Sequence, residues 1–206
     1  MEKLNEKLPF LSKEIIDEFK QYATVKDFPK GTQILREEQY VKVLPIVLNG
    51  VVKVFSNFGE KELLLYYIEA SQSCVMTFSA AMSNSPSKIF AITEEDAKIL
   101  LLPTKHISGW LKRFPGFNQL FYNQYDLRYT ELLSTIQYIL VDKIDVRLYK
   151  YLEQKATVTH QEYLKMTHNE IATELGTARE VISRALKKLE HQEKIIQNTH
   201  GIKIYP

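Results

Sequence analysis

Short apolar runs alternate with polar turns along the first hundred residues. Apolar positions at helical spacing predict a short helix after Ser12, a residue type suited to cap it. Runs of strand length then follow, separated by turn signals such as residues 29–31. The pair Asn49 and Gly50 lies between two such runs and predicts a hairpin, because both residues tolerate a positive φ. Many short strands at this spacing predict a sandwich or barrel.

A long helix is predicted from residue 115 to about 140, where neither Gly nor Pro occurs after Gly116. Apolar side chains step by three and four residues along it, in a row formed by Tyr122, Tyr125, Tyr129, Leu132, Ile136 and Ile139. A second apolar group lies on another face and consists of Phe117, Leu120, Phe121 and Leu127. Two apolar faces need two partners, so we expect the row to pair with a second copy of the chain. A helix buried entirely in its own domain is the alternative.

Two helices joined by a tight turn are predicted between residues 167 and 190. Thr167 and Glu170 have the spacing of a capping box, and so do Thr177 and Glu180. Gly176 between them suits the left-handed position that ends a helix. The second helix has an apolar stripe formed by Ile182, Ala185, Leu186 and Leu189. The segment therefore predicts a helix-turn-helix.

The candidate chemistry lies on the polar side of the second helix, at Arg179, Glu180, Ser183, Arg184 and Lys187. A recognition helix places its first turns in the major groove of DNA, where Arg bonds guanine and Glu accepts from cytosine. Lys187 suits a phosphate of the DNA. Thr167 and Thr177 are expected mainly to cap helices, with contacts to the DNA backbone as a secondary role. A purely structural interpretation also exists: Glu180 completes a cap and pairs with Arg184.

Two short apolar runs, 194–197 and 202–205, predict a hairpin around residues 198–201. Such a hairpin beside a helix-turn-helix is a wing, and His200 at its tip is a candidate contact to the DNA backbone; a solvated hairpin is the alternative. The net charge of +2 lies in residues 141–206, which hold 11 Lys and Arg against 9 Asp and Glu. This bias agrees with a nucleic-acid partner.

In these features the sequence resembles the Crp/Fnr family of transcription regulators. The resemblance is carried by residues 176–184 and by the wing, with looser support from residues 28–35 and 44–54. It implies an α+β protein with three parts. These are an N-terminal β-roll (jelly-roll) sensor domain at 1–114, a dimerisation helix at 115–140 and a winged helix-turn-helix at 141–206.

The resemblance further implies a homodimer that reads palindromic duplex DNA, with RNA polymerase as an expected partner and no enzymatic activity. The base-contacting positions of the family fall on Arg179, Glu180, Ser183 and Arg184. The half-site is expected to be of TGTGA or TTGA type, and the residues fit both.

The sequence departs from the family pattern in the sensor domain. Members that bind cyclic AMP carry Gly-Glu and Arg-Ser pairs, whose matching positions here are 76–77 and 87–88, and a hydroxyl pair that falls on 132–133. The Glu, the Arg and the hydroxyls are absent, and a Lys lacks the bidentate fork of Arg. We expect an effector other than cyclic AMP, in a pocket formed by Met76, Thr77, Ser87, Lys88 and Leu133.

Other sensor chemistries and protein classes are not favoured by the composition. The single cysteine, Cys74, is expected in the core, and it excludes an internal disulfide and an iron–sulfur cluster held by several thiolates. His106 is the only His before residue 160, so neither a haem nor the metal of a cupin-like enzyme is expected. A nucleotide-sensing module of kinases or channels would not need the helix-turn-helix. Without an apolar stretch of about 20 residues, we expect a cytoplasmic protein with no membrane partner.

Overall fold

The structure is a computed structural model of the 206-residue chain. It describes residues 4–58, 61–141 and 143–205, without the side chains of residues 5, 58, 61, 135 and 137–141. The chain divides into two compact units, one of Met1–Ser56 with Leu65–Tyr129 and one of Asn57–Leu64 with Thr130–Pro206.

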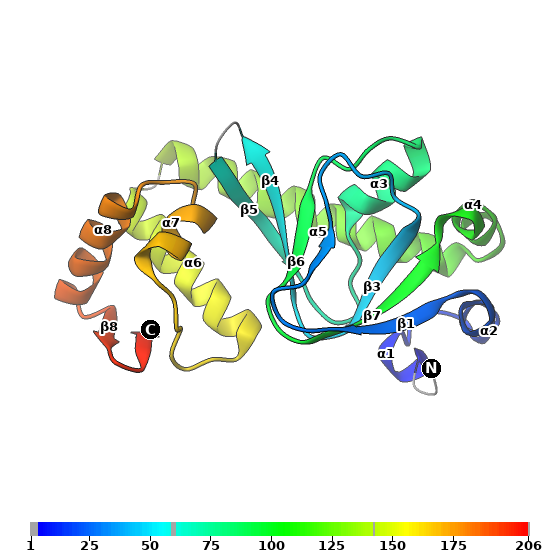
Figure 1. The fold of residues 1–206 in the computed structure, drawn as a ribbon, viewed down its shortest axis with the longest axis horizontal. Coiled ribbons are helices and arrows are strands. Elements are labelled where there is room, and N and C mark those ends of the chain that lie inside the picture. Colours follow the sequence, from blue (N-terminus) through cyan, green and yellow to red (C-terminus); the bar gives the residue numbers. More distant parts are fainter. Residues whose placement is uncertain (1–3, 59–60, 142, 206) are drawn as a thin grey trace. The chain divides into compact units, whose positions relative to one another are not determined.

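Two antiparallel sheets build the first unit, as expected for a β-roll, except that residues 57–64 at the ends of β4 and β5 are assigned to the second unit (Figure 1). The three-stranded sheet has the order β1 (Thr24–Phe28), β7 (Ala97–Pro103), β3 (Val43–Asn49). The four-stranded sheet has the order β2 (Gln33–Leu35), β6 (Phe90–Thr93), β4 (Val52–Phe58), β5 (Lys61–Ile68). Apolar side chains of both sheets form one buried cluster, which includes Val47, Val52, Val54, Ala91 and Ile99. The sheets are thus held together by the inward-facing positions of their strands.

The turn at Asn49 and Gly50 is not a hairpin, and that prediction is wrong. β3 pairs with β7 and β4 pairs with β6, so the turn carries the chain from one sheet to the other. Gly50 does have a positive φ of 82°, and a Cβ there would lie 2.3 Å from the carbonyl oxygen of Asp96. The local backbone was predictable, but the strand partner is set by a segment about fifty residues further along the chain.

Helices of the first unit are α1 (Leu4–Lys7), α2 (Lys13–Tyr22), α3 (Val75–Ser83), α4 (Thr104–Arg113) and the start of α5 (Pro115–Val141). α2 begins directly after Ser12, whose hydroxyl makes no capping bond. The rings of Phe19, Trp110 and Phe117 meet edge to face, with 5.1 Å between the centroids of Phe19 and Trp110. This aromatic cluster fixes α2, α4 and the first turn of α5 to one another.

Three helices and one hairpin form the C-terminal part of the second unit. They are α6 (Ile144–Thr159), α7 (His168–Glu174), α8 (Arg179–His191), β8 (Ile195–Asn198) and β9 (Gly201–Ile204). We call residues 144–205 the winged domain. Its core is a cluster of buried side chains that includes Leu148, Leu152, Ile171, Ile182, Leu186 and Ile202.

Candidate nucleic-acid interface

The first helix of the helix-turn-helix begins at the predicted capping box. The backbone N–H of Glu170 donates to the Thr167 hydroxyl (3.2 Å), and the N–H of Thr167 donates to the Glu170 carboxylate (2.7 Å). The Thr167 hydroxyl also donates to this carboxylate (2.8 Å), and the N–H and hydroxyl of Thr167 together hold the pKa of Glu170 below its ordinary value, with the N–H as the larger cause. The start of α7 is therefore fixed by a charge-assisted contact.

The turn between α7 and α8 uses Gly176 as predicted, with a φ of 63°. The N–H of Gly176 donates to the carbonyl of Thr173, and the N–H of Thr177 donates to the carbonyl of Ala172. This pair of bonds is a Schellman motif, which satisfies the last carbonyls of α7.

The second capping box, at Thr177 and Glu180, is a wrong prediction. Thr177 takes part in the end of α7, so the N-cap of α8 is Ala178, which makes no side-chain bond. The recognition helix consequently starts at Arg179.

The apolar stripe of α8 is buried and its polar side is open. Ile182 and Leu186 are fully buried against the domain core, and Ala185 and Leu189 nearly so. Most of the predicted DNA-reading side chains are exposed, namely Arg179, Glu180, Arg184 and Lys187. The Nε of Arg184 donates to the backbone carbonyl of Glu180 at 3.3 Å. Four charged groups thus face outward from consecutive turns of one helix.

Ser183 is half-buried and is held in place by a chain of hydrogen bonds. Its hydroxyl lies 3.0 Å from the carbonyl of Arg179, to which it donates, and 2.9 Å from Nδ1 of His168. Nε2 of His168 lies 3.2 Å from the Gln197 amide oxygen, and the Gln197 amide donates to Glu190 at 3.2 Å. The first residue of α7 therefore connects the recognition helix to the wing.

Sequence reasoning missed His168 as a member of this surface. Its neighbours Ser183 and Gln197 are 15 and 29 residues away along the chain, and no local pattern joins them. The only available signal was its position directly after the capping residue Thr167.

Lys188 is exposed like Lys187, but it is paired within the domain. Its ammonium bonds the carboxylate of Asp145 on α6, and this contact lowers the pKa of Asp145. The pair joins α6 to α8, whereas Lys187 is exposed and no such pair is described for it.

A buried ionic cluster joins α6 to α7. Lys155 Nζ lies 3.1 Å from the carboxylate of Glu174, and the Tyr151 hydroxyl donates to the same carboxylate. The side chains of Lys155 and Glu174 are 4% and 6% exposed, so two opposite charges compensate each other inside the domain.

The predicted wing is present, with β8 and β9 paired from Ile195↔Ile204 to Asn198↔Gly201. The backbone of Leu164 forms hydrogen bonds with Ile202 of β9, so a third segment of the same chain pairs with the hairpin. At the tip the N–H of His200 donates to Asn198 (2.8 Å), and the ring of His200 packs edge to face on Tyr163. His200 is exposed. The tip of the wing is thus short, structured and open to solvent.

The predicted dimerisation row on α5 is exposed. Its described side chains have relative exposures of 67% for Tyr122, 43% for Tyr125, 63% for Tyr129, 54% for Leu132 and 45% for Ile136. The side chain of Ile139 lies outside the described residues. Phe117, Leu120 and Phe121 of the other face are buried, whereas Leu127 is 37% exposed. One face of α5 is therefore covered by its own unit, and the row is left open.

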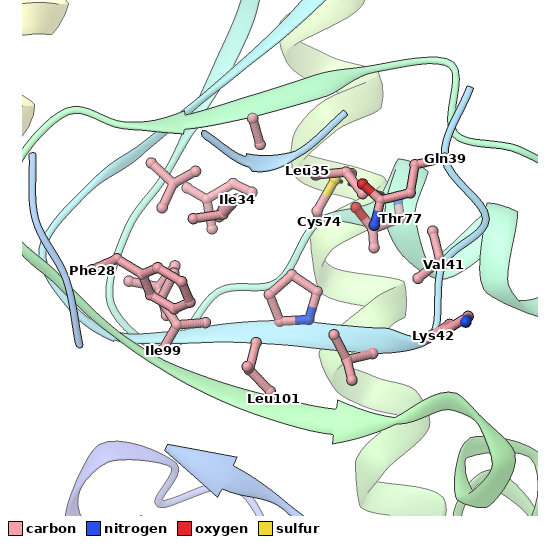
Figure 2. A pocket seen from close by; sticks show the side chains of 16 residues that line it. Phe28, Ile34, Leu35, Gln39, Val41, Lys42, Cys74, Thr77, Ile99 and Leu101 are labelled. Carbon is pink, nitrogen blue, oxygen red and sulfur yellow. Dashed lines mark hydrogen bonds between the residues drawn. The ribbon is translucent and has the colours of Figure 1, made fainter. Parts of the chain in front are cut away.

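The residues predicted for the effector pocket have different surroundings in the structure. Thr77 lines a cavity between the two sheets of the first unit, whereas Ser87 is buried and bonds the backbone of Ile89. Lys88 is exposed and Met76 is partly buried. Leu133 is half-exposed on α5. The cavity itself is lined by a mostly different set of side chains (Figure 2).

Within the described ranges, no cluster of three or more potential metal ligands occurs. Nor does any helix among these residues combine the length and apolar character needed to cross a bilayer.

Residues 146–205 match the family model of the Crp-like helix-turn-helix domain. No curated protein matches the chain. Among solved structures, a putative Crp/Fnr-family regulator from Eubacterium rectale is 21% identical, with a TM-score of 0.81, 95% of this chain and 91% of that chain covered. The c-di-GMP-responsive global regulator CLP of Xanthomonas campestris is 15% identical, with a TM-score of 0.81 and coverages of 95% and 100%. A Crp/Fnr-family regulator from Thermus thermophilus is 19% identical, with a TM-score of 0.76 and coverages of 89% and 94%. The chain thus has the α+β fold of the Crp/Fnr transcription regulators, and its C-terminal domain is a Crp-like helix-turn-helix.

Proposed function

We propose that this chain is a sequence-specific transcription regulator that binds palindromic duplex DNA as a homodimer. The observation that carries the proposal is the open polar side of α8, where Arg179, Glu180, Arg184 and Lys187 are exposed on the second helix of a helix-turn-helix. A recognition helix in this setting inserts its first turns into the major groove.

Each side chain on this surface has a separate role in the proposal. Arg179 and Arg184 each offer the bidentate fork that fits guanine, and Glu180 accepts from a cytosine amino group. Ser183 contacts the base edge or backbone from the position that His168 gives it. Contacts to phosphates come from Lys187, Thr167, Thr177 and His200. The wing tip and α8 would then approach the same stretch of duplex.

Pairing through α5 supplies the second reading head. The exposed row has the spacing of a coiled-coil seam, and burying large aromatic and aliphatic side chains is the main driving force for such pairing. Two recognition helices in a dimer of this kind meet successive major grooves about 34 Å apart, so the site is an inverted repeat. RNA polymerase is the expected further partner, the cytoplasm is the compartment, and no enzymatic role is proposed.

Cyclic AMP is not the proposed effector. The positions that match the ribose and phosphate contacts carry Met76, Thr77, Ser87 and Lys88, and the hydroxyl of Ser87 is taken up by the backbone of Ile89. The single cysteine does not provide the ligand set of an iron–sulfur cluster. Calorimetric titration is the direct test, and micromolar binding of cyclic AMP would contradict this part of the proposal.

Selection of sites from random duplexes with the full chain tests the function. We expect an enriched inverted repeat, with half-sites of TGTGA or TTGA type. Fluorescence anisotropy on the enriched site should then show tight binding by the wild type and weak binding by Arg179→Ala. The matched control is Arg113→Ala, which removes an exposed arginine from the first unit. No enrichment at moderate salt would refute the proposal.

A further inference from the structure

A small apolar cavity lies inside the first unit, between the two sheets. Its volume is about 130 Å³, and most of its lining is apolar, with Phe28, Ile34, Ile99 and Leu101 at one end (Figure 2). An apolar cavity of this size tends to stay dry and to accept a small apolar molecule, as a cavity of about 150 Å³ accepts benzene.

The opposite end of the cavity carries a buried hydroxyl without a partner. Thr77 is 1% exposed, and its Oγ1 has no hydrogen-bond partner among the described residues. The backbone N–H of Thr77 is already used, because it donates to the Cys74 sulfur at the start of α3. A buried hydroxyl normally finds a partner, because leaving its hydrogen bond unmade costs free energy. The Thr77 hydroxyl is therefore a donor and acceptor that a ligand in the cavity could use.

The surroundings of Thr77 favour a neutral ligand. Gln39 also lines the cavity, and its amide oxygen accepts from the N–H of Arg36 at 3.2 Å (Figure 2). Among the lining residues that the structure describes, only Lys42 is charged, and it points away from the other side chains. A charged group at Thr77 would be buried without a counter-ion, which is strongly unfavourable.

We propose that this cavity binds a small neutral amphiphile, with an apolar body and one hydroxyl group that bonds Thr77 Oγ1. The volume limits the ligand to roughly six to eight non-hydrogen atoms. A cyclic nucleotide is too large and too polar for this site. The proposed ligand binding does not depend on the proposed function, whereas a regulatory effect of the bound ligand rests on it.

Phenol is a suitable probe. Toluene is the control ligand of similar size without the hydroxyl, and benzoate is the charged control ligand. The cavity is lined by methyl groups, including those of Ile34, Val47, Val52, Ile68 and Ile99, so methyl NMR of the full chain reports both site and affinity. We expect saturable shifts of these methyl signals with phenol, weaker binding of toluene, and no such shifts with benzoate.

Substitutions at Thr77 test the hydroxyl. Thr77→Val keeps the shape and removes the group, and it should raise the Kd for phenol about five- to tenfold while leaving that for toluene unchanged. Thr77→Ser keeps the hydroxyl and should bind phenol within about twofold of the wild type. Ala91→Ile should fill the cavity and abolish binding of both neutral probes.

Three results would overturn the proposal: no saturable shift in the lining methyl groups, an unchanged phenol affinity in Thr77→Val, or benzoate binding as tight as that of phenol. None of these readouts involves DNA. A chain that binds phenol but ignores duplexes would refute only the proposed function, and a chain that binds its site but not phenol would refute only this inference.

Discussion

Arg179 and Ser183 lie one turn apart on α8, and they differ in how far the protein itself fixes them. Ser183 is tied to His168 and through it to the wing, whereas Arg179 is exposed. A side chain fixed by hydrogen bonds can contact DNA in one geometry only, whereas an exposed arginine can adapt to the groove at the cost of rotamer entropy. The residues of the candidate interface therefore differ in what a substitution removes.

Replacing Arg179 by alanine should remove one bidentate base contact. We expect a loss of about 1–3 kcal/mol in binding to the preferred site, and relaxed selectivity at one base pair. Lys187→Ala is the matched variant. It should weaken binding to all DNA sequences alike and lower the slope of log affinity against log salt concentration by about 0.9. Anisotropy titrations at several salt concentrations separate the two. Unchanged binding by Arg179→Ala would contradict the assigned role.

Glu170 should make the winged domain sensitive to acid. Its folded pKa lies below the ordinary value of 4.5, so its capping bonds stabilise the fold above that pH. This contribution is lost as the pH falls through the folded pKa. Glu170→Gln removes the titrating group, so between pH 7 and pH 4 the variant should lose less stability than the wild type in urea unfolding. Equal losses would refute this reading of the cap.

At the scale of elements, local sequence signals predicted well where helices begin and end, and less well which distant segment an element pairs with. The capping box at Thr167, the C-terminal Gly176 and the apolar stripe of α8 depend on neighbours within a few residues, and all three are present. The hairpin predicted at residues 49–50 is absent because β3 pairs with β7, a strand about fifty residues further along the chain. The cap at Thr177 failed because the end of α7 had already used that residue.

Contacts between elements explain what the sequence left out of the candidate site. His168 is connected to the candidate surface through Ser183 and Gln197, and Lys188 is paired with Asp145 on α6. Both outcomes depend on how α6, α7 and β8 pack around α8, which no spacing in the sequence encodes. The helix-turn-helix was therefore predictable, and its supporting network was not.

The buried pair of Lys155 and Glu174 should control the docking of α7 on α6. Lys155→Met leaves a carboxylate buried without its cation, so we expect a loss of about 3–5 kcal/mol in the free energy of unfolding. Lys155→Met combined with Glu174→Leu should recover most of that loss, because no charge then stays buried. Urea unfolding of the single and double variants gives the comparison. A double variant as unstable as the single one would argue against charge as the cause.

At the scale of the whole molecule, the exposed apolar row on α5 is the feature that supports pairing with a second copy of the chain. Leu132→Glu or Ile136→Glu places a charge in the proposed seam and should shift the chain toward monomer in sedimentation velocity. Binding to the palindromic site should weaken with it. Leu127→Glu is the matched control, since Leu127 is 37% exposed but lies outside the row. A seam variant that remains dimeric would place the interface elsewhere.

The open row also bears on how the protein responds to its own abundance. If pairing depends on this one short strip of side chains, free monomers prevail when the chain is scarce, and mass action then links pairing to operator binding. Occupancy would rise with the square of the monomer concentration in that range. A modest change in synthesis or degradation would accordingly produce a steeper change at the promoter, even before any small molecule enters the β-roll.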